Sequence, residues 1–333
     1  MSASTWTRRD MVNAAGAAGL VAAMPALAAA EPPPETTRIR LQDAPIACFA
    51  PLYVARALLE AEGFTDVQYV KSPAGVSFAQ AAASGQIDIV QDDAAAYTME
   101  LDRQAPLLVL GGLHTGCWEL FAQTSIRSMH DLKGKTISTP EGSSRAAFVA
   151  AMVAWVGLDP RRDIIWKSHA PEESMRLFEQ GKVDALLGFV PEPQVLRAKK
   201  IGHVLVNTLT DRPWSQYFCC LAAGNREFVR KHPIATKRAL RALLKAVDLC
   251  VSQPQSAARL MVDRGVPAAY EHVLQAVREV GYAKWREYEP EDTMRFWSLR
   301  LRELGIVKSD PKKLLSQGTD WRFIAQLRKE LKA

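Results

Sequence analysis

GQIDIVQ (residues 85–91) and GKVDALL (residues 181–187) repeat one pattern, in which a glycine precedes a short apolar run with a single aspartate. Each copy follows a segment of helical character, at residues 76–84 and 172–180. Glycine at such a point supplies the left-handed residue that ends a helix, and the apolar run predicts a strand. Two similar helix–strand units predict two α/β lobes that each send a strand toward a shared cleft.

The segments around the two copies extend this pattern. Strands are predicted at residues 38–42, 67–70 and 107–110, with helices between them, which is typical of a largely parallel sheet. Two long extended stretches, at residues 114–122 and 215–222, predict crossings between lobes. We expect lobe I to comprise residues 38–116 and 220–333, and lobe II residues 117–219. Each lobe should be a mixed, mostly parallel sheet flanked by helices, with the two crossing strands as a hinge.

The first 30 residues predict an export signal. Arg8 and Arg9 precede an Ala/Gly/Val/Leu-rich run at residues 14–23, and an Ala-rich stretch at residues 26–30 offers a cleavage site. The paired arginines indicate the twin-arginine type. The run is too short for a spanning helix, which needs about 20 apolar residues; a short N-terminal helix is the alternative interpretation. Residues 31–37 then form a proline-rich leader, and the mature protein is expected in the periplasm.

Composition excludes some classes of function. The chain has 333 residues, 48% of them apolar, which is enough for two domains of ordinary size. The net charge of +6 arises from 42 basic and 36 acidic residues that are interspersed along the chain. We therefore expect no nucleic-acid partner, because no basic–aromatic interleaving occurs. A monomer is expected.

The five cysteines contain no CxxC pair and no Cys/His spacing that suits zinc, so we expect no metal ion. An odd number leaves at least one thiol free. Cys219 and Cys220 are adjacent, and neighbouring side chains of a strand point to opposite faces. We interpret them as small buried apolar residues, and the sequence leaves open whether any cysteines pair.

Ligands of open α/β sheets bind beyond the carboxyl ends of the strands. The loop at residues 140–144 lies at such a place, and there Gly142 allows close approach while Ser143 or Ser144 caps the next helix. Unpaired amides at a helix N-terminus attract anions, although a plain helix cap is the alternative. The other expected loop positions are Cys48, Phe49, Ser72, Gly75, Val76 and, beside the first crossing, His114.

Acidic and aromatic residues on the same loops favour a different ligand. Asp92, Asp93, Glu119 and Glu192 would suit an amine, an amidine or a ring nitrogen that donates hydrogen bonds. Each acid alone is more often a cap or a solvated group, and Asp93 could cap the helix at Ala94. An aromatic wall could be formed by Phe49, Trp118, Phe189 and Trp214, with core packing as the alternative.

Catalysis is not expected. His114 and Cys117 suggest a base and a nucleophile, but they lie three residues apart on an extended segment, so their side chains point to opposite faces. No GxSxG, HExxH, P-loop or GxGxxG motif occurs. No catalytic residue and no cofactor are therefore predicted.

Several ordered motifs carry a family resemblance: APLYVA at residues 50–55, AASGQIDI at residues 82–89, DLKGKTI at residues 131–137, PEGS at residues 140–143 and GKVDA at residues 181–185. The chain resembles the periplasmic substrate-binding proteins of ABC importers over roughly residues 38–250. Within them it is similar to the nitrate/sulfonate/taurine group, which includes thiamine-pyrimidine-precursor-like proteins.

The resemblance implies a type II-like periplasmic-binding-protein fold that closes on a small ligand and delivers it to the permease subunits of an ABC importer. It implies that Phe49, residues 72–76, residues 92–94 and residues 143–144 line the cleft. A small sulfonate, a nitrate-like ion or a nitrogen-containing ligand would suit it. Asp92 and Asp93 depart from the small neutral residues expected there, which argues against a simple inorganic anion. A pyrimidine-precursor-forming enzyme on the same fold is the alternative.

Overall fold

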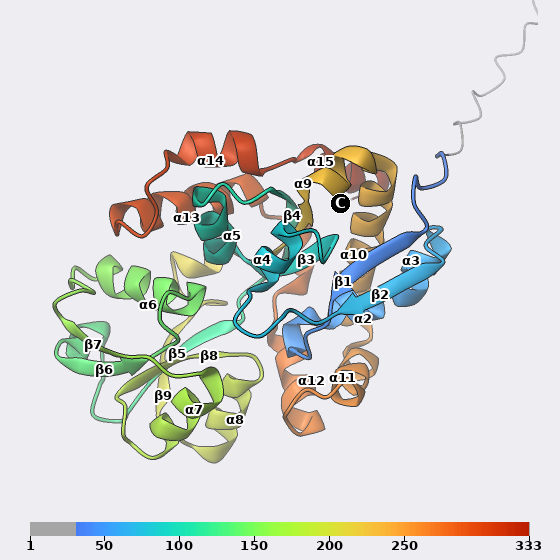
Figure 1. Ribbon diagram of the computed structural model, residues 1–333. Helices are drawn as coiled ribbons and strands as arrows, with labels where there is room; N and C mark the ends of the chain where they lie inside the picture. Colours follow the sequence, from blue (N-terminus) through green and yellow to red (C-terminus); the bar gives the residue numbers. More distant parts are fainter. Residues whose placement is uncertain (1–30, 333) are drawn as a thin grey trace, which may run out of the picture. The chain divides into compact units, whose positions relative to one another are not determined.

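The computed structural model describes residues 31–332. The export signal predicted at residues 1–30 lies outside the described residues. Two five-stranded mixed sheets organise the chain, with strand orders β2-β1-β3-β10-β4 and β7-β6-β8-β5-β9 (Figure 1). We name these sheets, with the helices that cover them, lobe I and lobe II. The two-lobed fold predicted from the sequence is confirmed.

The two sheets have the same internal pattern. In lobe I, β1 pairs in parallel with β2 and β3, and β10 pairs antiparallel with β3 and β4. In lobe II, β6 pairs in parallel with β7 and β8, and β5 pairs antiparallel with β8 and β9. In each lobe, therefore, a strand from one of the two segments that cross between the lobes pairs with the strand of the glycine–aspartate repeat. These pairs are β10 with β3 in lobe I and β5 with β8 in lobe II. The strands are β1 (Arg38–Gln42), β2 (Asp66–Val70), β3 (Ile89–Asp93), β4 (Leu107–Thr115), β5 (Trp118–Ala122), β6 (Lys135–Ser138), β7 (Ile164–Lys167), β8 (Ala185–Phe189), β9 (His203–Asn207) and β10 (Phe218–Asn225).

The aspartate of each repeat has the same structural role. Asp88 accepts a hydrogen bond from the backbone N–H of Arg40 at 2.8 Å, and Asp184 accepts one from the backbone N–H of Thr136 at 2.8 Å. In both lobes this bond ties the start of the repeat strand to the neighbouring parallel strand. The carboxylate of Asp88 also pairs with the guanidinium of Arg40. The repeated aspartates therefore stabilise the sheets and do not reach the cleft.

Helices cover both sheets. The segment after β10 forms a C-terminal set of helices, of which α10 packs on α2 and α3 and α15 packs on β4 of lobe I. The helices are α2 (Ala50–Val54), α3 (Arg56–Ala61), α4 (Phe78–Ala83), α5 (Ala94–Asp102), α6 (Ser144–Trp155), α7 (Pro171–Glu179), α8 (Glu192–Lys199), α9 (Arg226–Lys231), α10 (Pro233–Ser252), α11 (Pro254–Asp263), α12 (Tyr270–Glu279), α13 (Pro290–Glu303), α14 (Pro311–Gly318) and α15 (Arg322–Glu330), with the short 3-10 helices η1 (Ala47–Phe49), η2 (Met129–Leu132), η3 (Trp214–Gln216) and η4 (Tyr282–Arg286).

Two local predictions are corrected. Residues 91–93 are not a loop, because β3 continues to Asp93 by pairing with β10, where Asp93 faces Cys220. Phe189 and Glu192, also expected on a loop, belong to regular elements, because Phe189 ends β8 and α8 begins at Glu192. Pro193 lies in the first turn of that helix, where its missing N–H removes no helical hydrogen bond.

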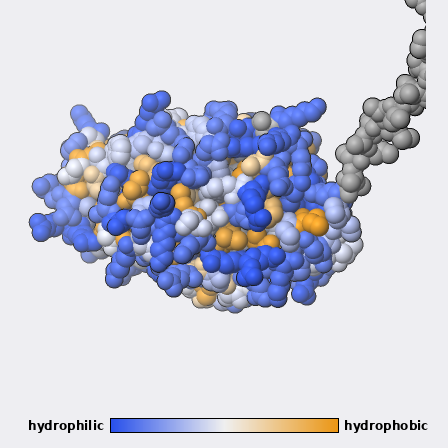
Figure 2. Space-filling model, turned by 90° about the horizontal axis from the view of Figure 1, so that it is seen from above, coloured by the Kyte–Doolittle hydropathy of each residue, from blue (hydrophilic) through white to orange (hydrophobic). Residues whose placement is uncertain are grey.

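Apolar side chains fill one large core that extends through both lobes, and a second small cluster around Phe121 and Phe178 lies within lobe II. On the face seen from above in Figure 2, apolar side chains form small areas separated by hydrophilic ones. Among the described residues, no helix is long and apolar enough to span a membrane. The C-terminal helix α15 packs by burying Phe323, Ile324 and Leu327.

Candidate functional site

A cavity of about 610 Å³ lies between the two lobes. Its walls come from the carboxyl ends of β3 and β8, from the N-terminal ends of α4 and α6, and from one side of α5. Cavities of this size hold ligands in many proteins. The lining residues are Ile46, Phe49, Gly75, Val76, Ser77, Phe78, Gln80, Asp92, Asp93, Ala96, Met99, Glu100, Arg103, Trp118, Pro140, Glu141, Gly142, Ser143, Ser144, Arg145, Pro171, Phe189 and Cys220.

Two adjacent carboxylates from lobe I face the cavity. Asp93 is the N-cap of α5 and accepts a hydrogen bond from the backbone N–H of Ala96 at 2.7 Å, as its position before Ala94 suggested. Its other oxygen accepts a hydrogen bond from the hydroxyl of Ser144 in lobe II at 2.6 Å. Asp92 accepts a hydrogen bond from the backbone N–H of Asp93 at 2.9 Å. The pair thus lies at the junction of the two lobes.

Burial raises the pKa of the Asp92 carboxyl well above its usual range, and the neighbouring charge of Asp93 raises it further. Burial also raises the pKa of Asp93, although hydrogen bonds from Ser144 and from helix amides oppose this effect. Two such close carboxylates hold a proton more readily than isolated ones. This wall of the cavity is therefore suited to a positively charged group or to N–H donors.

The wall from lobe II is the first turn of α6. Ser143 is the N-cap and accepts a hydrogen bond from the backbone N–H of Ala146 at 3.2 Å. Gly142 has a positive φ of 67°, which glycine adopts without strain. Ser143 therefore performs the plain helix cap that the sequence left as an alternative, whereas the hydroxyl of Ser144 is the one that crosses to lobe I.

Three aromatic rings converge beside these polar groups. The ring of Phe189 lies 4.2 Å from that of Trp118 and 6.3 Å from that of Phe49, centroid to centroid. Phe49 belongs to lobe I and the other two to lobe II, so the rings meet across the junction. This apolar wall would contact the flat or aliphatic part of an organic ligand.

The cations of the cavity are already paired. Arg145 forms a salt bridge with Glu192 at 3.1 Å and lies over the ring of Trp118. Arg103 forms a salt bridge with Glu100 at 2.5 Å. Among residues 31–332, these two are the basic residues that line the cavity, and each already has a carboxylate partner.

The remaining predicted positions lie outside the cavity lining. Glu192 holds Arg145 in place, and Cys48 and His114 are fully buried beneath the cavity. Ser72 is half-buried before α4. Trp214 packs against Trp297, with ring centroids 6.0 Å apart, which is the core packing named as the alternative.

Glu119 joins a separate polar network across the lobes. Its carboxylate and that of Glu279 in α12 both pair with the guanidinium of Arg197 in α8. These groups border a second cavity of about 210 Å³. Burial raises the pKa of Glu119, against the opposing influence of Arg197. This carboxylate therefore helps join lobe II to the C-terminal helices of lobe I.

Some cavity residues were missed from the sequence. Arg145 follows directly after the predicted Ser143–Ser144 pair, and helix periodicity from the cap could have placed it in the first turn. Gln80 and Glu100 lie on helix faces, where Gln80 donates a hydrogen bond to Glu100 at 3.0 Å, and Arg103 directly follows α5. No local motif distinguishes such residues from an ordinary solvated face.

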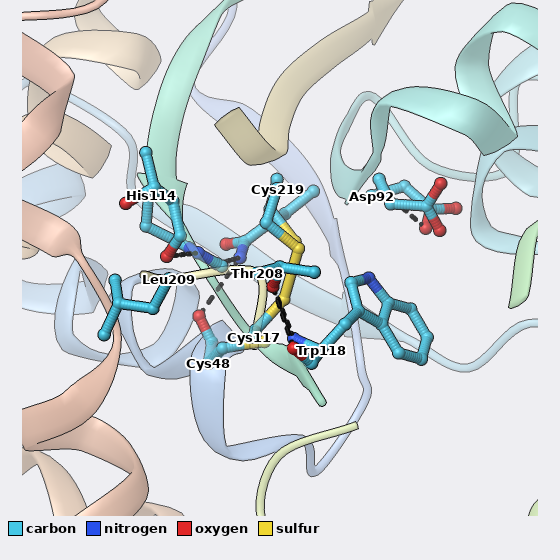
Figure 3. The surroundings of a disulfide bond; sticks show 12 residues. Cys48, Asp92, His114, Cys117, Trp118, Thr208, Leu209 and Cys219 are labelled. Atoms are coloured by element: carbon cyan, nitrogen blue, oxygen red, sulfur yellow. Dashed lines mark hydrogen bonds between the residues drawn. A yellow bond between two sulfur atoms is a disulfide. The ribbon is translucent and has the colours of Figure 1, made fainter. Parts of the chain in front are cut away.

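A disulfide joins Cys117 to Cys219, which corrects the interpretation of Cys219 as a small apolar residue. Cys117 precedes β5 and Cys219 lies at the start of β10, so the bond links the two segments that connect the lobes (Figure 3). The sulfur atoms of Cys219 and Cys220 lie 4.0 Å apart, so these side chains do not point to opposite faces. The register of β10 against β4 is irregular at this point, which explains the difference.

The same bond removes the suggested nucleophile, because Cys117 has no free thiol. His114 is buried and has Gln91 as its side-chain neighbour, with 3.1 Å between the amide and ring nitrogens. The pair therefore lacks the arrangement of a base and a thiolate.

Two α/β lobes with a ligand-sized cavity between them are the architecture of the periplasmic-binding-protein fold. The chain belongs to the NMT1/THI5-like family, which it matches over residues 46–257. No curated protein matches the chain in sequence. The family resemblance inferred from the motifs is confirmed.

Solved structures share the fold at low sequence identity. The periplasmic nitrate-binding protein NrtA from Synechocystis PCC 6803 is 14% identical, with a TM-score of 0.78 over 90% of both chains. The alkanesulfonate-binding protein SsuA from Xanthomonas axonopodis pv. citri, bound to MOPS, is 18% identical, with a TM-score of 0.68 over 83% of this chain and 96% of that one. The periplasmic aliphatic sulphonate binding protein SsuA from Escherichia coli is 19% identical, with a TM-score of 0.66 over 83% and 90%.

Proposed function

We propose that the protein is an exported solute-binding receptor of an ABC importer that holds a small organic ligand between its lobes. The cavity of about 610 Å³ supports this proposal, since it draws its walls from both lobes. The family and the binding proteins that share the fold support it as well. The receptor would deliver its ligand to permease subunits in the inner membrane and act as a monomer in the periplasm.

The single observation that carries the choice of ligand is the pair Asp92–Asp93 at the lobe junction. Both carboxylates line the cavity, and the lining arginines are already paired with Glu100 and Glu192. An anion placed there would meet two carboxylates without a free cation, which is unfavourable in a partly desolvated site. The ligand would instead be nitrogen-containing, with N–H donors or a positive charge toward Asp92 and Asp93.

The aromatic wall adds a second requirement. Phe49, Trp118 and Phe189 meet beside the carboxylates, and their faces favour a flat ring or a short aliphatic chain. An amino-substituted pyrimidine or another small heteroaromatic amine combines both features. Organic sulfonates and nitrate-like ions carry a negative charge, which does not suit the carboxylates of Asp92 and Asp93.

The test is a binding screen on the purified mature protein. Calorimetry would compare aminopyrimidines and small aromatic amines with sulfonates and nitrate of similar size. Amine binding at one molecule per chain, lost in Asp92→Asn, supports the proposal. Tight binding of nitrate or a sulfonate that improves in Asp92→Asn would overturn the choice of ligand. Turnover of any ligand would support the alternative, an exported enzyme on the same fold.

A further inference from the structure

Two thiols and an imidazole lie together beneath the cavity. The candidate ligand atoms of Cys48, His114 and Cys220 lie within 4.8 Å of one another. The three residues are 0%, 0% and 1% exposed. Nothing in the proposed receptor function uses this cluster, and its neighbours Cys117 and Cys219 are already bonded to each other.

The fold brings the three residues together from distant segments. His114 in β4 and Cys220 in β10 are cross-strand partners, which places their side chains close together. Cys48 lies in η1, whose backbone is held against the strands because the Cys48 carbonyl accepts hydrogen bonds from Tyr282 and Gln91, both at 3.1 Å. The cluster is therefore positioned by backbone contacts and not only by its own side chains.

The hydrogen bonds around His114 prepare its ring for a metal ion. The amide nitrogen of Gln91 donates to the Cys48 carbonyl and lies 3.1 Å from Nε2 of His114, so Nε2 acts as the acceptor. The proton of the neutral ring is then on Nδ1, which faces the carbonyl of Thr115 at 3.4 Å. A neutral histidine whose other N–H is directed to a backbone carbonyl is the usual metal-binding form.

We propose that Cys48, His114 and Cys220 form a binding site for one divalent thiophilic ion of the Zn²⁺ or Cd²⁺ type. Thiolate sulfur and imidazole nitrogen are the ligands such ions prefer. Binding would release the two thiol protons, and the ion with two thiolates and a neutral imidazole forms an uncharged centre. A monovalent ion would leave one negative charge buried, which is costly.

The geometry requires only a small adjustment. Zinc bonds of about 2.3 Å to sulfur and about 2.0 Å to nitrogen place tetrahedral ligand atoms roughly 3.3–3.8 Å apart, so atoms now within 4.8 Å would move closer by about one ångström. Cys220 lines the interlobe cavity, which offers the ion a path to the site. An ion at Nε2 of His114 would displace the Gln91 amide nitrogen from the ring, while Tyr282 would still hold the Cys48 carbonyl. Oε1 of Gln91, a buried acceptor without a hydrogen-bond partner within residues 31–332, could then turn toward the ion as a fourth ligand.

This proposal replaces the sequence-based expectation of no metal. Zinc motifs are recognised by close spacing, whereas these ligands lie 66 and 106 residues apart along the chain. Only the register between β4 and β10 and the position of η1 bring them together.

The experiment titrates the purified mature protein, with its Cys117–Cys219 disulfide intact, with Cd²⁺ alone. We expect one ion per chain, an ultraviolet thiolate-to-cadmium absorption band, release of two protons, and a Tm that rises with the concentration of free Cd²⁺. Absence of stoichiometric binding to the folded wild-type protein would overturn the proposal. A Cys48–Cys220 or Cys219–Cys220 disulfide, found by peptide mass spectrometry, would overturn it too.

Variants assign the site. Cys250 is a third buried free thiol, outside this cluster, so Cys250→Ala is the matched control and should bind as the wild type does. Cys48→Ala and Cys220→Ala should each weaken binding by more than tenfold and lose part of the absorption band. His114→Ala should weaken binding while keeping the band, because both thiolates remain. Equal binding by Cys48→Ala and the wild type would contradict the assignment, and the wild-type stoichiometry decides the question if a variant fails to fold.

Discussion

The carboxylate of Asp93 accepts a hydrogen bond from the hydroxyl of Ser144 at 2.6 Å, and this bond joins the N-terminal ends of one helix from each lobe. Asp93 is the N-cap of α5, and Ser144 is the first residue of α6. The carboxylate of Asp93 therefore already occupies the place where the positive ends of these two helix dipoles meet. The adjacent serine, Ser143, makes no such contact, since its hydroxyl donates to the Pro140 carbonyl and caps α6.

The different contacts of Ser143 and Ser144 predict different effects when each is replaced by alanine. Ser144→Ala removes a hydrogen bond between the lobes and should weaken ligand binding about fivefold to tenfold, with little change in Tm. Ser143→Ala removes a helix cap and should lower the free energy of unfolding by about 1 kcal/mol, with little change in affinity. Calorimetry and chemical denaturation of both variants check this. Equal loss of affinity in both would contradict the separation of roles.

Asp92 predicts a pH dependence of stability. Burial raises the pKa of its carboxyl well above the usual range, so the folded chain holds a proton that the unfolded chain releases. The contribution of Asp92 to stability is present below the pKa of an unfolded aspartate, about 3.9, and is lost as the pH rises through the raised value in the folded state. Asp92→Asn should therefore gain stability relative to the wild type as the pH rises. Denaturation at a series of pH values measures the difference, and a constant difference would contradict the raised pKa.

The network of Glu119, Arg197 and Glu279 predicts that removing the charge of Arg197 lowers the stability of the folded chain. Arg197→Leu leaves the buried Glu119 unpaired and should lower the free energy of unfolding by about 2 kcal/mol, less than for a fully enclosed pair because Arg197 is partly exposed. The loss should shrink at acidic pH, where Glu119 takes up a proton. Arg176→Leu is the control, because Arg176 pairs with Glu173 on the surface of α7. Chemical denaturation that shows equal losses for both variants would contradict the role of Arg197.

The disulfide predicts a large contribution to stability. It closes a loop with a sequence separation of 102, and such a long loop loses much conformational entropy in the unfolded chain. The double variant Cys117→Ser/Cys219→Ser should lose about 3–5 kcal/mol of unfolding free energy. Denaturation of the oxidised wild type, of this variant and of Cys250→Ala as a control measures it. A loss no larger than that of Cys250→Ala would show that the crossing segments are held by packing alone.

The fold could be predicted from local signals because its defining features are local. The glycine–aspartate repeat and the alternation of strands and helices indicate two related lobes, and each motif is complete within a few residues. The ends of the elements were less accessible. The continuation of β3 to Asp93 depends on pairing with β10, more than 120 residues later, and no local pattern records such a partner.

Some of the residues that line the cavity could also be predicted from local signals. Phe49, Asp92, Asp93 and Ser144 follow or precede regular elements at the edge of a sheet, so their type and position suggested a cleft. Glu119 and Trp214 occupy similar positions in the sequence but face other partners, Arg197 and Trp297, that the chain supplies from distant helices. The cluster of Cys48, His114 and Cys220 was missed for the same physical reason, since three remote segments form it.

The Cys117–Cys219 bond has a consequence for chain integrity. The chain enters lobe II beside one of these residues and leaves it beside the other, so lobe II is a covalently closed ring attached at a single neck. A protease that cuts one peptide bond within this ring leaves both fragments joined as one molecule. A nicked molecule would therefore keep the halves of lobe II together, and would separate into two chains only after reduction.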